Sequence, residues 1–305
     1  MWGFVLDFFS NMIDQLGLRR HTVSNSEHVL RRVLPHPNPF FIHTAMNTPT
    51  TVPEILTHLD AGVMTLTINR LERKNSITAV MYAAMADALA AAEQDPAVRV
   101  VVIQGHETIF SAGNDIGDFL NKPPSTPDAP VFRFLHGISS FPKPIVAAVC
   151  GPAVGIGTTL LLHCDLIYAG DNAAFSMPFV NLGLCPEAAS SLLVPQLMGY
   201  PRAVEALLLG EPFTAETALE VGLINRIVPP LEASVLAHQQ ARKLAGKPLP
   251  SLIETKRLMK KTLASVTAER LAEESISFGR MLGEPAAREA FTAFMEKRKP
   301  DFSGV

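Results

Sequence analysis

The strongest constraint in this sequence is a long uncharged stretch, Pro144 to Cys164, which contains 21 residues without Asp, Glu, Lys or Arg. A helix of this length can span a lipid bilayer. The middle of the stretch, however, reads GPAVGIG (residues 151–157), and glycine and proline of this density interrupt a continuous helix. A buried strand, a glycine turn and a buried helix explain the stretch at least as well. We therefore expect a buried protein core here and no membrane segment.

Composition indicates a globular chain with a sizeable core. Of the 305 residues, 48% are hydrophobic, which argues against disorder. The formal net charge is −3, so no broad positive field exists to hold nucleic acid, and we expect no nucleic-acid partner. The three cysteines, Cys150, Cys164 and Cys185, form no C-x-x-C pair. This sparse use suits a reducing compartment and predicts neither a disulfide framework nor a zinc cluster.

The sequence divides into three parts. Residues 1–50 include the proline-rich stretch LPHPNPFF, which cannot form regular structure, and we expect an appended N-terminal extension with Met46 as an alternative start. Residues 51–247 are expected to form the core domain. Residues 248–305 are expected to form a helical region used for subunit contact, with helices over 252–263 and 268–297.

Strand and helix patterns alternate within the core domain. Met64, Leu66 and Ile68 alternate with polar residues, which predicts a strand. Apolar residues then recur every fourth position from Ile77 to Leu89, which predicts a helix with Ser76 or Thr78 as its N-cap. Further strands are expected over 98–103, 145–149 and 166–168. This alternation predicts an α/β core.

Two glycine-containing turns are the first candidate functional feature. FSAGNDI (residues 110–116) and GPAVGIG (residues 151–157) each follow a predicted buried strand. Backbone N–H groups at such turns can bind a ligand oxygen, and two that converge form an oxyanion hole. Glycine also simply permits a tight turn, and spacing alone favours this plainer interpretation. Neither turn matches a nucleotide-binding pattern.

A single carboxylate, Glu187, stands among small and apolar residues in LGLCPEAASS (residues 182–191). In an apolar pocket the pKa of such a group rises, and the group can transfer protons. A helix that starts at Pro186, with Glu187 in its first turn, explains the same pattern and is favoured by spacing alone. The nearest acidic residues in sequence are Asp171 and Glu205, so no local carboxylate pair exists.

The triplet His163-Cys164-Asp165 is the remaining candidate for metal binding or nucleophilic chemistry. It stands at the end of an apolar helix, with no second ligand group at metal spacing. We therefore expect three ordinary core residues and no metal site.

Taken together, these segments resemble the crotonase, or enoyl-CoA hydratase/isomerase, superfamily. The resemblance covers residues 52–303 and rests on an ordered set of motifs: TLTINRLERKNSI, FSAGNDI, PKPIVAAVCGPAVGIGTTLLLHCDLIYA and the F-x-x-P-F-x-x-L-G-L-x-P-E run from Phe175. It implies a crotonase-like spiral of ββα turns with a C-terminal helical trimerisation region, assembled as a homotrimer or a dimer of trimers. It also implies an acyl-CoA thioester as ligand. No metal or redox cofactor is implied, since coenzyme A is part of the substrate.

The resemblance also implies roles for particular residues. Glu187 matches the catalytic glutamate, and the backbone N–H groups of Asn114 and Ile156 match the oxyanion-hole donors. Substrate and CoA contacts are implied at Lys74, Ser76, Ala112, Gly113, Asp115, Ile116, Gly155, Phe179 and Leu184. We further expect an apolar acyl pocket lined by Phe119, Phe134, Met177, Phe179 and Leu184.

Departures from the hydratase pattern indicate the reaction. Enoyl-CoA hydratases of this superfamily use two glutamates, at positions that match Thr159 and Phe179 here. The P-E-small-x-S-S context of Glu187 is closer to the peroxisomal-type Δ3,Δ2-enoyl-CoA isomerases, as are S-A-G-N-D and G-P-A-V-G-I. The resemblance thus predicts an isomerase of fatty-acid β-oxidation that converts a 3-enoyl-CoA to trans-2-enoyl-CoA with one glutamate.

Several alternatives stay open. Another acyl-CoA reaction of the superfamily is possible, such as hydration, thioester hydrolysis or dehalogenation, and a second carboxylate within reach of Glu187 would favour hydrolysis or dehalogenation. A non-catalytic acyl-CoA-binding protein is the third alternative. The chain ends in FSGV rather than a peroxisomal S-K-L address, so we expect a cytoplasmic protein.

Overall fold

A six-stranded sheet forms the centre of the structure, a computed structural model that describes residues 53–121, 123, 124, 126 and 128–305. The strand order is β1-β2-β3-β4-β6-β9, in which β1 pairs antiparallel with β2 and all other neighbours are parallel. These strands are β1 (Ile55–Asp60), β2 (Val63–Ile68), β3 (Val100–Gln104), β4 (Ile145–Val149), β6 (Leu166–Gly170) and β9 (Arg226–Val228). The predicted extension, residues 1–50, lies outside the described residues.

A second sheet contains three short strands, β5 (Pro152–Val154), β7 (Ala174–Ser176) and β8 (Phe213–Thr214). Strand β5 is parallel to β7, and β7 is antiparallel to β8. The chain passes from β4 into β5 through Gly151, whose φ is +63°. A Cβ at this position would lie 2.0 Å from the Thr108 carbonyl oxygen, so only glycine fits the turn between the two sheets.

Helices connect and cover the strands. They are α2 (Ala79–Gln94), α3 (Ile116–Asn121), α4 (Pro130–Ser140), α5 (Ile156–Thr159), α6 (Ser190–Met198), α7 (Tyr200–Val204), α8 (Ala215–Glu220), α9 (Pro230–Ala245), α10 (Leu249–Leu282) and α11 (Pro285–Glu296). The chain also forms 3₁₀ turns at η1 (Leu71–Arg73), η2 (Leu160–His163) and η3 (Val180–Leu182), and a π-helical turn at η4 (Glu205–Leu209). Of the two predicted caps for α2, Thr78 is the one used, because its hydroxyl accepts the Met81 N–H at 3.3 Å.

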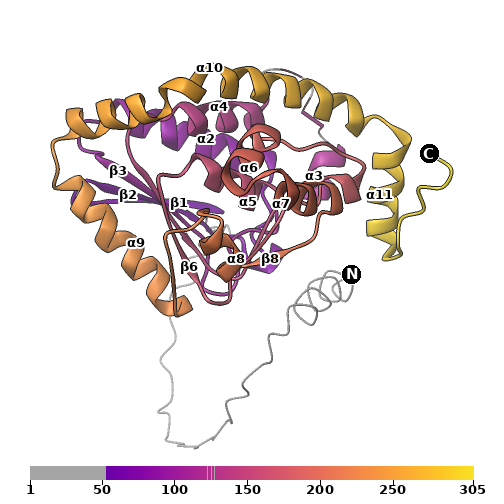
Figure 1. Cartoon of the computed structure of the whole chain (residues 1–305), viewed down its shortest axis with the longest axis horizontal. Helices are drawn as coiled ribbons and strands as arrows, with labels where there is room; N and C mark the ends of the chain where they lie inside the picture. Colours follow the sequence, from indigo (N-terminus) through magenta and orange to yellow (C-terminus); the bar gives the residue numbers. More distant parts are fainter. Residues whose placement is uncertain (1–52, 122, 125, 127) are drawn as a thin grey trace, which may run out of the picture. The chain divides into compact units, whose positions relative to one another are not determined.

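Strand alternation gives the large sheet two apolar faces. Val101 and Ile103 of β3 belong to the core covered by α2 and α4, whereas Val100 and Val102 belong to the core covered by α9. Helix α9 lies close to its face because its buried residues are all alanine: Ala233, Ala237, Ala241 and Ala245. Figure 1 shows α9 on one side of the sheet and the long helix α10 crossing over α2 and α4 on the other.

The uncharged stretch is buried core, as predicted. It forms β4, β5, α5 and η2 in succession, and every residue of β4 is buried. In the part of the chain that the structure describes, no helix is long and apolar enough to cross a membrane. The α/β class is confirmed.

The C-terminal helices differ from the prediction. We expected a break between residues 263 and 268, but α10 runs without interruption through all 34 of its residues. The segment ASVT (264–267) contains neither glycine nor proline, so nothing there stops a helix. The break falls at Gly283, and α11 begins at Pro285, a favoured first helical residue.

Candidate active site

The two predicted glycine turns lie side by side. Ser111 and Ala153 form a parallel bridge between them, and the Val154 N–H donates to the Ser111 carbonyl at 2.9 Å. Gly113, with φ +88°, leaves no room for a side chain, because a Cβ would lie 2.8 Å from the Val154 carbonyl oxygen. The close approach of the two turns therefore requires glycine at this position.

The backbone N–H groups of Asn114 and Ile156, one on each turn, are available to a ligand. The N–H groups of Gly113, Asp115 and Gly155 are bonded to Ser111 Oγ, the Ile77 carbonyl and the Ser176 carbonyl. Among the described residues, neither Asn114 N–H nor Ile156 N–H has an acceptor. Ile156 is the first residue of α5, which adds the positive end of a short helix dipole. Two such donors on adjacent turns can bind one anionic oxygen.

Glu187 is buried beside these turns. Glu187 is only 7% exposed, and the hydroxyl of Thr159, in α5, donates a hydrogen bond to its Oε1. Burial raises the pKa of Glu187 to about 8; the Thr159 hydrogen bond opposes this rise, and the negative charge of Glu274 adds to it. A carboxyl group with a pKa near neutrality can both accept and return a proton at physiological pH.

Tyr82 of α2 is hydrogen-bonded to the first turn. Its hydroxyl donates to Asn114 Oδ1, and its side chain is 1% exposed. Burial, and then the charge of Glu187, raise the pKa of Tyr82 well above its usual value, so the hydroxyl remains a donor. Tyr82 was not among the site residues predicted from the sequence, although it lies beside Met81 on the apolar face of the predicted helix.

Residues 74–77 run along the first turn and bring the other predicted contacts to it. The Lys74 carbonyl accepts the Ala112 N–H at 3.0 Å, and the Ile77 N–H donates to the Gly113 carbonyl at 2.8 Å. Lys74, Ala112 and Gly113 are therefore adjacent, and their contact with a ligand stays a prediction.

Ser76 and Asp115 belong to a polar network at the edge of this site. Asp115 Oδ2 pairs with Arg70 at 2.7 Å and accepts the Ser76 hydroxyl at 3.2 Å. Burial raises the pKa of Asp115, but Arg70 and the other donors outweigh it, so the pKa lies below its usual value. A carboxylate held in this way orders the turn rather than exchanging protons.

An apolar cluster adjoins the second turn. It contains three of the residues predicted to line an acyl pocket, Met177, Phe179 and Leu184, with Ile116 and Phe119 packed against it. Phe179 lies beside Gly155, since a Cβ there would be 3.9 Å from its ring. Phe134 does not join this cluster: it belongs to the main core, where its ring centroid lies 5.7 Å from that of Tyr82.

A second buried carboxylate, Glu274 of α10, was missed by the sequence analysis. Its Oε2 accepts the Ala189 N–H at 2.6 Å, and its Oε1 accepts the Ser191 N–H at 2.9 Å. Glu187 is therefore isolated in sequence but not in space. The sequence does contain an indication that Glu274 is buried. Leu271, Glu274 and Phe278 have the spacing of one helix face, and all three are buried in α10.

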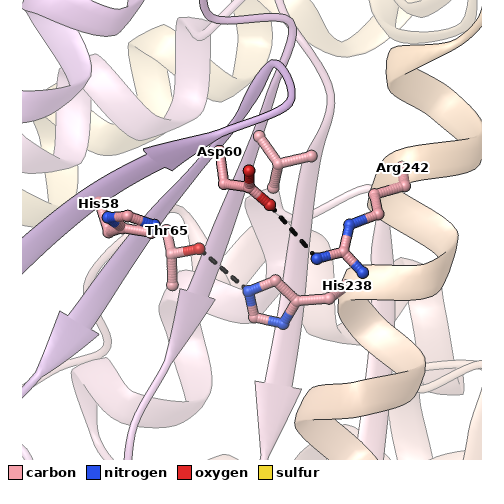
Figure 2. Close-up of a pocket in the computed structure, with 6 residues that line it drawn as sticks. His58, Asp60, Thr65, His238 and Arg242 are labelled. Atoms are coloured by element: carbon pink, nitrogen blue, oxygen red, sulfur yellow. Dashed lines mark hydrogen bonds and ion pairs between the residues drawn. The ribbon is translucent and has the colours of Figure 1, made fainter.

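A hollow of about 200 Å³ lies elsewhere in the molecule, between β1, β2 and α9. Figure 2 shows two pairs among the residues that line it, Asp60 with Arg242 and Thr65 with His238, whose atoms are 3.4 Å and 3.0 Å apart. It contains none of the predicted site residues. Within residues 53–305, apart from the three undescribed loop positions, no cluster of His, Cys, Asp and Glu could hold a metal ion.

Comparison with known proteins identifies the family of this chain. The family model described as enoyl-CoA hydratase/isomerase matches residues 58–305. The 1,2-epoxyphenylacetyl-CoA isomerase of Escherichia coli (strain K12) is 37% identical over 260 residues, covering 82% of this chain and 98% of the relative. Enoyl-CoA delta isomerase 2 of Rattus norvegicus is 37% identical over 213 residues, covering 68% of this chain and 54% of the relative.

The fold agrees with the same family. The structure of Pseudomonas aeruginosa OdaA superimposes with a TM-score of 0.78 at 46% identity, covering 80% of this chain and 99% of that one. The crotonase-like α/β fold predicted from the motifs is thus confirmed. The chain belongs to the enoyl-CoA hydratase/isomerase family.

Proposed function

We propose that this family member is a Δ3,Δ2-enoyl-CoA isomerase, which moves the double bond of a 3-enoyl-CoA into conjugation with the thioester. The observation that carries the proposal is the environment of Glu187. It is a buried carboxyl with a pKa raised to about 8, and it accepts a hydrogen bond from Thr159 of α5, the short helix whose first residue is the N–H donor Ile156. Such a group suits transfer of one proton between two carbon atoms.

The proposed reaction needs one base. The Glu187 carboxylate removes a proton from C2, and the C–H electron pair forms a dienolate whose negative oxygen accepts the N–H groups of Asn114 and Ile156. The protonated Glu187 then returns the proton to C4, and the double bond now joins C2 and C3. Preorganised donors of this kind typically contribute about 3 kcal/mol each to stabilisation of the oxyanion.

The residues at the hydratase positions support an isomerase. Addition of water by the two-carboxylate route requires glutamates at the positions of both Thr159 and Phe179. Thr159 instead donates its hydroxyl to Glu187, and Phe179 is 4% exposed in the apolar cluster. The site therefore provides one proton-transferring carboxylate, Glu187. At position 179, where hydratases have a glutamate, it presents an apolar side chain.

Glu274 is the observation that favours a rival, water-using reaction such as thioester hydrolysis. It is a second carboxylate close enough for its charge to raise the pKa of Glu187. Both of its oxygens, however, already accept backbone N–H groups. A carboxylate engaged in this way is poorly placed to activate water, so we rank hydrolysis second.

Thr159→Val is expected to shift the pH dependence of the reaction. It preserves the shape of the side chain but removes the donor that stabilises the Glu187 carboxylate, so the pKa of Glu187 should rise further. At pH 7 we expect kcat/KM to fall about tenfold, with partial recovery above pH 9, because one pKa unit changes the deprotonated fraction about tenfold. The measurement is a pH profile of kcat/KM, with Thr159→Ser as the control that keeps the hydroxyl. A profile identical to that of the wild type would show that the hydrogen bond does not tune Glu187.

Gly155→Ala is expected to impair the Ile156 donor. Gly155 has φ +54° and ψ −119°, a conformation that alanine disfavours, while the nearest atom to a new Cβ is 3.9 Å away. The strain is thus in the backbone alone. We expect kcat to fall about 10²-fold, the size of losing one oxyanion donor. Gly137→Ala, in an open position on α4, is the matched control and should leave kcat unchanged. A folded Gly155→Ala enzyme with normal kcat would mean that Gly155 serves only the turn.

The activity itself is tested with purified enzyme and 3-enoyl-CoA substrates of short, medium and long chains. We expect the absorbance of the conjugated 2-enoyl thioester to rise without release of free thiol. Thiol release without conjugation would instead support the hydrolase. The homotrimer or dimer of trimers and the independence from a metal or redox cofactor remain predictions of the resemblance, and the cytoplasmic location remains a separate prediction from the sequence.

A further inference from the structure

The turn that follows Glu187 has an uncommon backbone conformation. Ala188 and Ala189 have φ of +60° and +57°, so two consecutive non-glycine residues occupy the left-handed region. This conformation is strained for a residue with a side chain, and it persists only where surrounding contacts determine it. The direction in which the Glu187 side chain leaves the backbone depends on this turn. Contacts that hold the turn therefore also hold the base.

Glu274 provides the contacts on one side of the turn. It comes from α10, 85 residues beyond Ala189, and it is 5% exposed. Its two carboxylate oxygens accept the N–H groups of Ala189 and Ser191 at 2.6 and 2.9 Å. These N–H groups belong to the residue before α6 and to its first turn, where no helical acceptor exists. A carboxylate is the only ionised side chain that can accept both.

His163 provides the contact on the other side. Its Nε2 lies 2.9 Å from the Ala188 carbonyl oxygen, and the side chain is 2% exposed. Burial lowers the pKa of His163 to about 4, so the ring is neutral at pH 7 and donates its Nε2 proton to this carbonyl. The Ser190 hydroxyl also donates to the Glu187 carbonyl at 2.6 Å. The turn is thus fixed at successive peptide groups.

We propose that Glu274 is a positioning residue for catalysis, which holds the Ala188–Ala189 turn through its two backbone hydrogen bonds and so directs the Glu187 carboxylate toward the substrate. This inference rests on the proposed function, because it takes Glu187 as the base. It gives α10 a role in the chemistry: the C-terminal helix supplies the residue that fixes the base. Glu274 itself touches no reacting atom.

The charge of Glu274 has a second effect, on the proton affinity of Glu187. The negative charge of Glu274 disfavours ionisation of Glu187 and so raises its pKa, in addition to the larger effect of burial. The other titratable and charged groups around the pair come from several elements: Tyr82 of α2, His163 of η2, Cys185 before Glu187, and Arg270 of α10. Removing the charge of Glu274 should therefore lower the pKa of Glu187.

The test compares Glu274→Gln with the wild type in the full chain. Glutamine keeps the size of the side chain but presents only one acceptor oxygen, so one of the two backbone bonds is lost. We expect kcat to fall 10- to 100-fold with KM within about threefold, and the acid limb of the kcat/KM profile to move to lower pH. Glu269→Gln, at an exposed position of the same helix, is the matched control and should leave kcat and the acid limb unchanged.

A purely structural Glu274 would give a different result. The folded Glu274→Gln enzyme would then be less stable to heat but would keep the kcat and acid limb of the wild type, and this outcome would overturn the proposal. If Glu274→Gln does not fold, Glu274→Asp is measured instead. Its shorter side chain cannot reach both N–H groups, so kcat should fall while the retained charge keeps the acid limb in place. Unchanged kcat in Glu274→Asp would likewise overturn the proposal.

A second readout separates this inference from the isomerase assignment. Exchange of the C2 hydrogen of a saturated acyl-CoA with D₂O requires the base and the oxyanion donors, but no double-bond migration. A wild type that exchanges C2 hydrogen without isomerising 3-enoyl-CoA would reject the proposed function. The positioning role is then measured as a 10- to 100-fold slower exchange in Glu274→Gln, and an unchanged exchange rate would reject that role too.

Discussion

Replacing Glu187 with glutamine is expected to lower kcat for the conversion of 3-enoyl-CoA to 2-enoyl-CoA by about 10³-fold, within the range expected for loss of a positioned general base. Glutamine has nearly the same shape, but it cannot take up the C2 proton. The N–H groups of Asn114 and Ile156 are untouched by the change, so binding of an acyl-CoA should persist. The measurement pairs steady-state kinetics with acyl-CoA binding by calorimetry.

The control for this variant is Glu205→Gln, at the next acidic position along the chain, which is exposed. It should leave both kcat and binding unchanged. A Glu187→Gln enzyme that retains more than a tenth of the wild-type kcat would contradict the assignment of Glu187 as the only base.

The same substitution is expected to stabilise the fold at alkaline pH. The pKa of Glu187 is raised to about 8 by burial, whereas an unfolded glutamate has a pKa near 4.5. Below pH 4.5 both states are protonated, and the group contributes nothing to the pH dependence. Between pH 4.5 and 8 Glu187 is deprotonated in the unfolded state but still protonated in the folded state, so the free energy of unfolding falls as pH rises. Above pH 8 the destabilisation caused by burying Glu187 is complete. This cost is on the order of 3–5 kcal/mol.

Urea unfolding of both proteins at pH 5 and pH 9 measures this effect. The free energy of unfolding of Glu187→Gln, relative to the wild type, should be higher at pH 9 than at pH 5 by a few kcal/mol. The catalytic base would then reduce stability under the conditions in which it is ionised and active. Equal pH dependence in the two proteins would show that Glu187 is not buried as a protonated acid.

Local sequence patterns predicted the parts of the site that depend on backbone conformation. Gly113 and Gly155 are needed for φ values of +88° and +54°, and a glycine turn after a buried strand is visible in a single sequence. The apolar alternation at Met64–Ile68 likewise predicted β2, because side chains of a strand point to opposite faces. The antiparallel strand β1 was not predicted, since most of its side chains are exposed and give no apolar pattern.

Contacts between distant segments could not be predicted in this way. Glu187 is the only carboxylate in its segment, yet Glu274 reaches the same turn from a helix that folds back over the core. Phe134 resembled a pocket residue by type, but its place on α4 directs it into the main core beside Tyr82. In both cases the position of the side chain depends on how helices pack against one another. The spacing of residues within one segment does not predict this packing.

The most direct test of the account supplies the wild-type enzyme separately with a 3-enoyl-CoA and with the corresponding trans-2-enoyl-CoA, and follows all products by mass spectrometry. The site has one proton-transferring glutamate and no carboxylate at positions 159 and 179. We therefore expect the rate of conversion of the 3-enoyl to the 2-enoyl thioester to exceed the rate of hydration of the 2-enoyl thioester by at least about 10²-fold, which is the lower end of the contribution of a general base. Formation of 3-hydroxyacyl-CoA at a comparable rate, or release of free coenzyme A in place of the isomer, would contradict it.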